Sequence, residues 1–253
     1  MENSRVTNKP GIGQCAPSFH AISTQGEINF PGEYQGRWVV FFSYQADFTP
    51  ICTTELMMFA YEVDDFKKLN VQLIGISCDS IYTHIAWLRR VKELVWKDMK
   101  HMEVDIPLIT DSSMEITRQY GMLFQDNIGV HTDRTVFVID PEGKIKACLT
   151  YPTSVGRNIQ EIKRLVIALI KTEADNTATP ADWVPGEDVM LLPPITCLSA
   201  AERIEKVNEN MYCLDWFIGF KQSNNNAATE VTEPEANPYP SAYPVRRRTN
   251  YRR

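Results

Sequence analysis

A cysteine at the start of a predicted helix is the strongest candidate for chemistry in this sequence. It lies in the segment Asp47-Phe-Thr-Pro-Ile-Cys-Thr-Thr-Glu55. Thr49 is a preferred N-cap residue and Pro50 suits the first helical position, so the helix should start there and carry Cys52 in its first turn. Free backbone N–H groups and the positive end of the helix dipole favour the thiolate of a cysteine at that position. The segment therefore predicts a nucleophilic cysteine.

Strands and helices that alternate along the chain must position this cysteine. Short β-branched and aromatic runs predict buried strands over residues 38–44, 71–77, 106–109, 135–139 and 144–150. Apolar residues at helical spacing predict helices after Cys52 and over residues 81–95, 112–120 and 159–169. A turn signal at residues 140–143 indicates that the last two strands form a hairpin. The sequence thus predicts an α/β domain whose mixed sheet is covered by helices on both faces.

The chain changes character after this α/β part, and we expect three segments. Residues 1–172 form the main domain, residues 173–221 a C-terminal extension, and residues 222–253 a tail. Within the extension we expect a short helix over 199–207, and an aromatic stretch over 213–220 needs a surface to bury it. The tail contains no Leu, Ile, Phe or Met and is predicted to be disordered, with its five arginines in solvent.

The composition is that of a soluble globular protein. Hydrophobic residues make up 43% of the 253 residues and charged residues 23%, and the formal net charge is −6. The negative balance argues against binding to nucleic acid or to an anionic membrane. No apolar run reaches the roughly 20 residues that a membrane span needs, and the polar N-terminus lacks the apolar core of a signal peptide. We therefore expect a cytoplasmic location.

The six cysteines and four histidines offer little support for a metal site or a disulfide framework. The sequence has no Cys-x-x-Cys pair, and no histidine adjoins a cysteine. A reducing compartment would keep the thiols free. Cys78 and Cys148 are expected to be inert core residues and Cys15 to be incidental, whereas the histidines receive no role. No metal or other cofactor is predicted.

Residues 47–56 resemble the active-site signature of the peroxiredoxins of the AhpC/TSA type, which have a thioredoxin-like fold. Further segments resemble the long, one-cysteine subgroup of that family, at residues 74–80, 84–87, 134–140, 151–158 and 179–183. The resemblance covers about residues 11 to 221. It implies a thiol-specific peroxidase that reduces hydrogen peroxide and organic hydroperoxides and contributes to antioxidant defence. It also implies a homo-oligomer, either a dimer or a decamer.

The resemblance assigns roles to individual residues. Cys52 is implied to be the peroxidatic cysteine, which attacks the peroxide and becomes a sulfenic acid. Thr49 is implied to offer its hydroxyl to the bound peroxide, and Pro50 to shield the sulfur from water. Arg134 is implied to pair with the thiolate and to bind substrate, with Arg157 as a second arginine of the site. A thiol reductant such as a thioredoxin-like protein would complete the cycle, without metal or haem.

Two segments depart from the subgroup. Tyr44 and Gln45 stand where a His-Pro pair is common, so no histidine is available there to assist the oxidised cysteine. Residues 75–79 lack the second glycine of the lipase-like Gly-x-Ser-x-Gly motif that some members carry, so we predict no phospholipase function.

The resolving step is open from sequence alone. Archaeal-type members end in Cys-x-Asp-Trp followed by a second cysteine, which resolves the oxidised site of a neighbouring subunit. Here Cys213 preserves the first cysteine, but Gly219 occupies the position of the second. Cys213 is favoured as the resolving thiol, with Cys197 or an external thiol as alternatives.

Two further functions compete with the peroxidase hypothesis. A thioredoxin-like disulfide reductase is disfavoured because no Cys-x-x-Cys pair exists. An oligomeric peroxide sensor or a chaperone-like binding protein would not consume peroxide with a thiol reductant, so turnover distinguishes it from a peroxidase.

Overall fold

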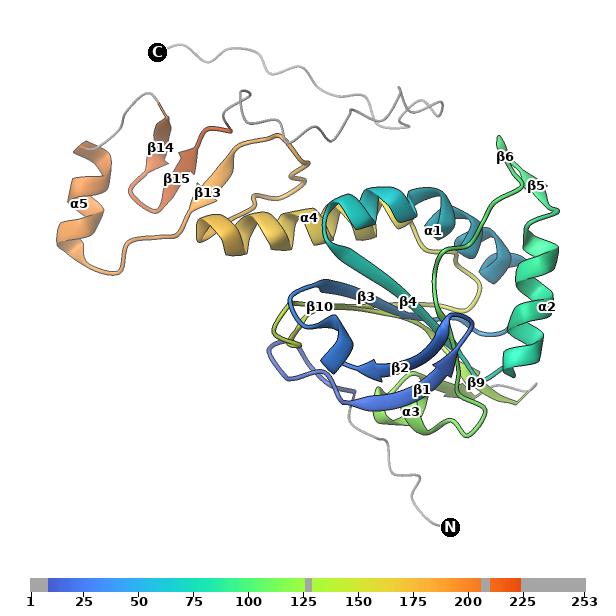
Figure 1. Ribbon diagram of the computed structural model, residues 1–253. Coiled ribbons are helices and arrows are strands. Elements are labelled where there is room, and N and C mark those ends of the chain that lie inside the picture. Colours follow the sequence, from blue (N-terminus) through green and yellow to red (C-terminus); the bar gives the residue numbers. More distant parts are fainter. Residues whose placement is uncertain (1–8, 126–128, 206–209, 224–253) are drawn as a thin grey trace.

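A seven-stranded mixed sheet forms the centre of the computed structural model, which describes residues 9–125, 129–205 and 210–223 (Figure 1). Its strands, in spatial order, are β11 (Ile145–Tyr151), β10 (Arg134–Ile139), β3 (Trp38–Ser43), β4 (Val71–Ser77), β7 (Leu108–Thr110), β1 (Phe19–Ser23) and β2 (Gly26–Phe30). β3, β4 and β7 run parallel, and the other neighbours pair antiparallel. The expected mixed sheet and the β10–β11 hairpin are confirmed.

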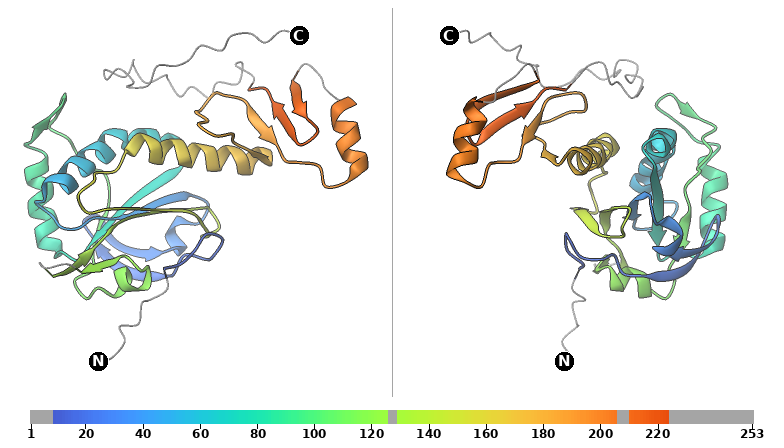
Figure 2. Two further views of the ribbon diagram at one scale, coloured as in Figure 1. Left: turned by 180° about the vertical axis from the view of Figure 1, so that it is seen from behind. Right: turned by 60° about the vertical axis from the view of Figure 1, so that its left-hand side comes forward.

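Helices cover both faces of this sheet. α1 (Pro50–Lys68), α2 (Ile81–Val91) and α4 (Ile159–Asp175) contribute to one cluster of buried side chains. α3 (Glu115–Gln119) packs into a second cluster on the opposite face. α1 and α4 lie side by side (Figures 1 and 2). The α/β class predicted from the alternating pattern is therefore confirmed.

The central strand β3 shows how the sequence builds both layers of the core. All six of its residues are buried. Val40 and Phe42 belong to the cluster beneath α1, whereas Val39 and Phe41 belong to the other cluster. A strand that is buried on both faces requires a continuous apolar run instead of alternation. β3 then leads through residues 44–49 directly into α1.

Small elements complete the main domain. They are a 3-10 helix (Gly32–Tyr34) and the two short hairpins β5 (Val95–Trp96) with β6 (Met99–Lys100) and β8 (Leu123–Gln125) with β9 (Val130–Thr132). The predicted helix over 81–95 was too long, because the chain leaves the helix after Val91 and Val95 pairs with Lys100 in the first hairpin.

The chain beyond α4 forms a smaller four-stranded sheet of its own. Its strand order is β12 (Thr177–Ala178), β13 (Val189–Leu191), β15 (Ile218–Lys221) and β14 (Met211–Asp215), with helix α5 (Cys197–Glu205) beside it. Figures 1 and 2 show this unit at the far end of α4. α4 itself runs past residue 172, so the predicted boundary falls inside a helix. The tail prediction concerns mainly residues 224–253, which lie outside the described residues.

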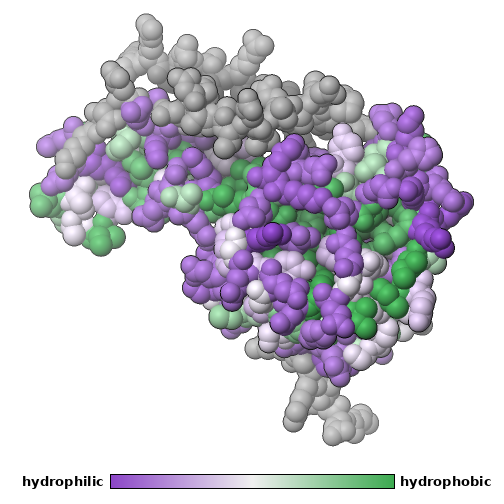
Figure 3. Space-filling model, in the orientation of Figure 1, coloured by the Kyte–Doolittle hydropathy of each residue, from purple (hydrophilic) through white to green (hydrophobic). Residues whose placement is uncertain are grey.

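The aromatic stretch predicted to need cover forms the β14–β15 hairpin. Trp216 and Phe217 lie at its turn and are 42% and 46% exposed. Ile195, Leu198 and Leu214 of the same unit are exposed as well. Figure 3 shows apolar side chains at the surface of this unit. The described residues of one chain therefore leave a large part of both side chains at the hairpin turn exposed.

Candidate active site

Cys52 lies where the sequence predicts, in the first turn of α1. Thr49 is the N-cap in an extended conformation, Pro50 is the first helical residue and Cys52 the third. Cys52 is only 1% exposed. The Thr49 side chain does not cap the helix; its Oγ1 instead donates to the backbone oxygen of Ala46 at 2.7 Å. The loop between β3 and α1 thus fixes the Thr49 hydroxyl beside the helix start.

Arg134, the first residue of β10, extends its guanidinium to Cys52. Its Nη1 lies 3.4 Å from Cys52 Sγ and 2.9 Å from Glu55 Oε2, and its Nε donates to the backbone oxygen of Thr153 at 3.0 Å. Its Nη2 donates to Gln45 Oε1 at 2.9 Å. Arg134 is 1% exposed, so its positive charge is held close to the sulfur with little screening by water. That charge favours a thiolate over a thiol.

Arg157 reaches the same carboxylate from the segment before α4. Its Nη2 and Nε donate to the two oxygens of Glu55 at 2.6 and 3.1 Å, and its Nη1 donates to the Ser43 backbone oxygen at 2.9 Å. Its guanidinium also lies over the ring of Phe42, 5.3 Å from the centroid. The structure brings Arg157 to the site, but it directs the side chain to Glu55 and Ser43.

Glu55 is the residue that sequence reasoning missed. It lies inside the signature, one helical turn after Cys52, and therefore on the same side of α1. Its carboxylate is buried and pairs with both arginines. Two guanidinium groups against one carboxylate leave one positive charge unbalanced, and a Cys52 thiolate is the group that would balance it. The spacing from Cys52 was the available signal.

Comparisons with known proteins agree with this geometry. The sequence profile of the AhpC/TSA family matches residues 12–148, and that of the C-terminal domain of 1-Cys peroxiredoxin matches residues 170–206. The chain belongs to the peroxiredoxin family. A peroxiredoxin of Methanosarcina mazei is 50% identical over 214 residues, which are 84% of this chain and 98% of that protein. One of Aquifex aeolicus is 42% identical over 223 residues, which are 84% and 97% of the two chains.

Solved structures give the same result. A cysteine-to-serine mutant of Peroxiredoxin 6 of Arenicola marina matches with a TM-score of 0.75 and 32% identity, covering 85% of this chain and 99% of that one. A yeast mitochondrial 1-Cys peroxiredoxin, described as resolved via glutathione/thioredoxin systems, matches with a TM-score of 0.73 and 35% identity, covering 85% and 100%. This chain is accordingly a thiol-dependent peroxidase with a thioredoxin-like fold.

A buried histidine anchors the loop that precedes Cys52 in this peroxiredoxin. His84 of α2 is fully buried, and its Nδ1 lies 2.7 Å from Asp47 Oδ2. The sequence assigned the histidines no role because none has a carboxylate or cysteine neighbour at ligand spacing, and it therefore did not predict the contact of His84 with Asp47. The two residues are 37 positions apart. Tyr44 joins them, because its hydroxyl lies 3.1 Å from Asp47 Oδ1 and 3.3 Å from His84 Nδ1.

The hydrogen-bond geometry of this cluster requires a proton between His84 and Asp47. The backbone oxygen of Ile109 lies 3.2 Å from His84 Nε2 and can only accept, so Nε2 carries a hydrogen. A further proton must then lie between His84 Nδ1 and Asp47. Burial raises the pKa of Asp47, and it raises that of Tyr44 well above its ordinary value. The backbone of Asp47 is also held in place, because its N–H donates to Asp79 Oδ2 at 2.8 Å.

The other cysteines of this peroxiredoxin lie away from Cys52. Cys213 is on β14, half-buried, with its Sγ 4.0 Å from the Arg203 backbone oxygen, and Cys197 is exposed at the start of α5. In Figures 1 and 2, β14 and α5 lie at the opposite end of the molecule from the start of α1. Within one chain, the structure therefore does not bring Cys213 or Cys197 to Cys52.

Cys78 and Cys148 are half-buried instead of fully enclosed in the core. Burial raises the pKa of the Cys78 thiol to about 11 and also raises that of Cys148. Neither thiol has the adjacent guanidinium that Cys52 has. Cys15 is exposed in the N-terminal segment.

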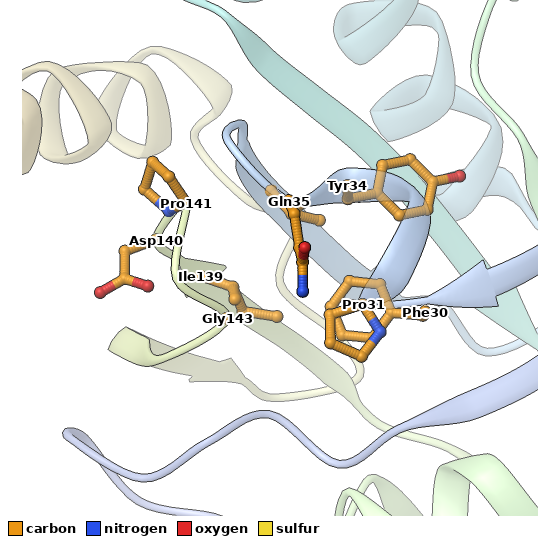
Figure 4. Close-up of a pocket in the computed structure, with 9 residues that line it drawn as sticks. Phe30, Pro31, Tyr34, Gln35, Ile139, Asp140, Pro141 and Gly143 are labelled. Atoms are coloured by element: carbon orange, nitrogen blue, oxygen red, sulfur yellow. The ribbon is translucent and has the colours of Figure 1, made fainter.

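A small cavity of about 10 Å³ lies at the other end of β3 (Figure 4). Its lining includes Phe30, Pro31, Tyr34 and the turn after β10, and it contains no cysteine. It belongs to the scaffold. Among the described residues, no group of three or more His, Cys, Asp or Glu side chains could hold a metal ion. In the same ranges, no helix has both the length and the apolar character to cross a membrane.

Proposed function

We propose that Cys52 is the peroxidatic cysteine and that Arg134 and Thr49 bind the peroxide beside it. The observation that carries this proposal is the 3.4 Å approach of Arg134 Nη1 to Cys52 Sγ within a buried site. The unbalanced positive charge of Arg134, Arg157 and Glu55 supports a thiolate, which is the nucleophilic form of cysteine.

The reaction starts when the Cys52 thiolate attacks the terminal oxygen of a peroxide R–O–OH. An S–O bond forms and the O–O bond breaks, so Cys52 is oxidised to a sulfenic acid. The departing RO⁻ takes up a proton and leaves as an alcohol or as water. Negative charge develops on that oxygen, where the guanidinium of Arg134 is a preorganised donor.

Thr49 suits the role of acceptor for the peroxide hydrogen. Its Oγ1 hydrogen is already donated to the Ala46 backbone oxygen, so its lone pairs are left to accept a hydrogen bond from the peroxide O–H. Arg157 contributes through Glu55, which it holds in place for Arg134. In this assignment Arg157 is a positioning residue, and Arg134 is the arginine that touches substrate.

A thiol reductant of the thioredoxin type, or glutathione, is proposed to return Cys52 to its reduced form. Cys213 of a neighbouring subunit is the favoured resolving thiol, with Cys197 or direct reduction by an external thiol as alternatives. The opposite placement of β14 and the start of α1 supports resolution between subunits over resolution within one chain.

We propose that the protein assembles at least as a dimer, or as a decamer built from dimers. The exposed apolar side chains of the C-terminal unit support this assembly, because several large apolar side chains left in solvent on one small unit favour an interface. The unit, at residues 173–221, is proposed to provide contacts between subunits, next to a main domain at 1–172. A cytoplasmic location belongs to the same proposal, supported by six free thiols.

The decisive experiment follows peroxide consumption by purified protein with dithiothreitol. The wild type is expected to turn over, and Cys52→Ser to have no activity, with both proteins giving the same circular dichroism spectrum. After one equivalent of peroxide, a carbon-nucleophile trap for sulfenic acids should label the Cys52 peptide by forming an S–C bond, with the sulfenic oxygen leaving as water. A Cys52→Ser protein that retains a tenth of wild-type turnover would exclude this mechanism.

A further inference from the structure

The guanidinium of Arg134 has a partner that the peroxidatic signature does not contain. Gln45 lies in the loop between β3 and α1, and its Oε1 accepts from Arg134 Nη2 at 2.9 Å. A guanidinium only donates, so the amide oxygen must face it, and this settles the orientation of the Gln45 amide. Gln45 is half-buried, at one of the two positions where this chain departs from a common His-Pro pair.

Each nitrogen of the Arg134 guanidinium donates to a different residue. The Nε edge donates to the Thr153 backbone, and Nη1 serves both Glu55 and Cys52. Gln45 is the described residue that accepts from Nη2. A proline at this position would offer no side-chain acceptor, so the Nη2 end would depend on solvent. With the Gln45 hydrogen bond, the guanidinium plane is held at all three nitrogens, in the orientation that points Nη1 toward the sulfur of Cys52.

The neutral charge of Gln45 matters as much as its geometry. The charged or titratable groups around Arg134 are Cys52 and Glu55 on α1, Tyr151 on β11 and Arg157 before α4. Glu55 already balances one of the two arginines. A carboxylate at position 45 would balance the second and would remove the charge that a thiolate needs. An amide accepts the same hydrogen bond without that effect.

We propose that Gln45 is a positioning residue for Arg134 that orients the guanidinium while leaving its charge to the thiolate and the departing oxygen. The inference rests on the proposed roles of Cys52 and Arg134. It predicts that geometry and charge can be separated by two substitutions at one position. Gln45→Met removes the acceptor at nearly constant length, and Gln45→Glu keeps the acceptor but adds a negative charge.

The test measures the second-order rate constant for hydrogen peroxide between pH 5 and pH 10 by stopped flow. Gln45→Met should lower the high-pH plateau at least about threefold, since the lost hydrogen bond is to a charged group. Gln45→Glu should recover the plateau to within about threefold of wild type, but the midpoint of its pH profile should rise, because the added negative charge disfavours a second one nearby. If Gln45 only stabilised the fold, one substitution would not lower the plateau alone while the other shifted the midpoint alone.

Gln72→Met is the matched control, because Gln72 is also half-buried but lies at the start of β4, at the other end of the sheet. It should keep both the plateau and the midpoint. A plateau of Gln45→Met within threefold of wild type, or an unshifted midpoint for Gln45→Glu, overturns the inference. Thermal melting identifies variants that fail to fold, in which case Gln45→Asn replaces Gln45→Met. Residual peroxide reaction in Cys52→Ser would instead overturn the proposed function itself.

Discussion

Arg134 and Glu55 form a buried ion pair at 2.9 Å, one helical turn from the sulfur of Cys52. The pair links the second turn of α1 to the start of β10, so Cys52, the proposed nucleophile, and its cation are placed by two elements of the same rigid core. Arg157 adds a second cation to the same carboxylate. The arrangement explains how a buried cysteine can lie beside a fixed positive charge in a low-dielectric interior.

Removing Arg134 should slow the chemical step. We expect Arg134→Ala to lower the second-order rate constant with hydrogen peroxide by at least about 10-fold, or about 1.4 kcal/mol of transition-state stabilisation. Stopped-flow kinetics measure this directly. Arg164→Ala is the control, because Arg164 pairs with Glu161 at the surface of α4. An unchanged rate in Arg134→Ala would show that Arg134 takes no part in the reaction and has only a structural role in β10.

Glu55→Gln should destabilise the fold, since it removes the carboxylate that pairs with two buried arginines. Breaking a buried ion pair by removing one partner typically costs about 3–5 kcal/mol. Chemical denaturation of the reduced protein measures the free energy of unfolding. Glu161→Gln, which affects only a surface ion pair, should change it by less than about 1 kcal/mol. Equal stability of the two variants would contradict the central role of Glu55.

Cys78 should make stability fall at alkaline pH. Burial raises its pKa from 9.0 to about 11, so the folded state favours the protonated thiol. The contribution is fully present below about pH 9 and is lost as the pH rises toward about 11. Cys78→Ala should therefore lose less stability than wild type between pH 8 and pH 11, whereas the exposed Cys15→Ala should follow wild type. Parallel stability curves for all three proteins would contradict the raised pKa.

Resolution by Cys213 should produce a covalent dimer. After one equivalent of peroxide, non-reducing gels of wild type should show a dimer that is absent in Cys52→Ser and in Cys213→Ser. A dimer that persists in Cys213→Ser but disappears in Cys197→Ser would assign the role to Cys197. If the wild type forms no dimer, reduction proceeds through an external thiol. Disulfide formation requires Cα atoms within about 7 Å, and because Cys52 is almost fully buried, the first turn of α1 must open before a second thiol reaches its sulfur.

The C-terminal unit should hold the subunits together. Sedimentation velocity of the full chain at micromolar concentration is expected to give a dimer or a larger assembly. Trp216→Ser together with Phe217→Ser should weaken it, because both side chains are exposed within one chain. Deletion of residues 224–253 should leave the assembly unchanged. A monomeric wild-type protein would contradict the proposed interface.

The parts of the site that follow from local rules could be predicted from sequence. The N-cap preference of Thr49 and the tolerance for Pro50 at the first helical position depend only on neighbouring backbone, and they located Cys52 correctly. Arg134 required the family resemblance, because no local rule connects a strand residue to a cysteine 82 positions away. The same limit explains why the pairing of His84 with Asp47 was missed. Such contacts depend on how α2 packs against the loop.

The error over residues 81–95 has a different cause. Apolar residues continue at helical spacing as far as Val95, so periodicity alone extends the helix. The chain instead turns back at Lys97, whose φ of 52° places it in the left-handed region, and Trp96 pairs with Met99. A two-residue hairpin turn overrides the apolar pattern there, because the pattern records which side chains can be buried and not where the backbone reverses.

Because Cys52 is almost fully buried, its two proposed reaction partners, a small peroxide and a thiol of a protein, differ in how easily they can reach the sulfur. A peroxide has only a few heavy atoms and needs a much smaller opening to the sulfur than a thiol carried by a protein does. The protein thiol therefore requires the first turn to open further. The contacts that hold this turn, from Arg134 and from Asp47 through the loop, then determine how fast the turn opens. In the proposed reaction, this opening rate sets how long the Cys52 sulfenic acid can meet a second peroxide before a reductant reaches it.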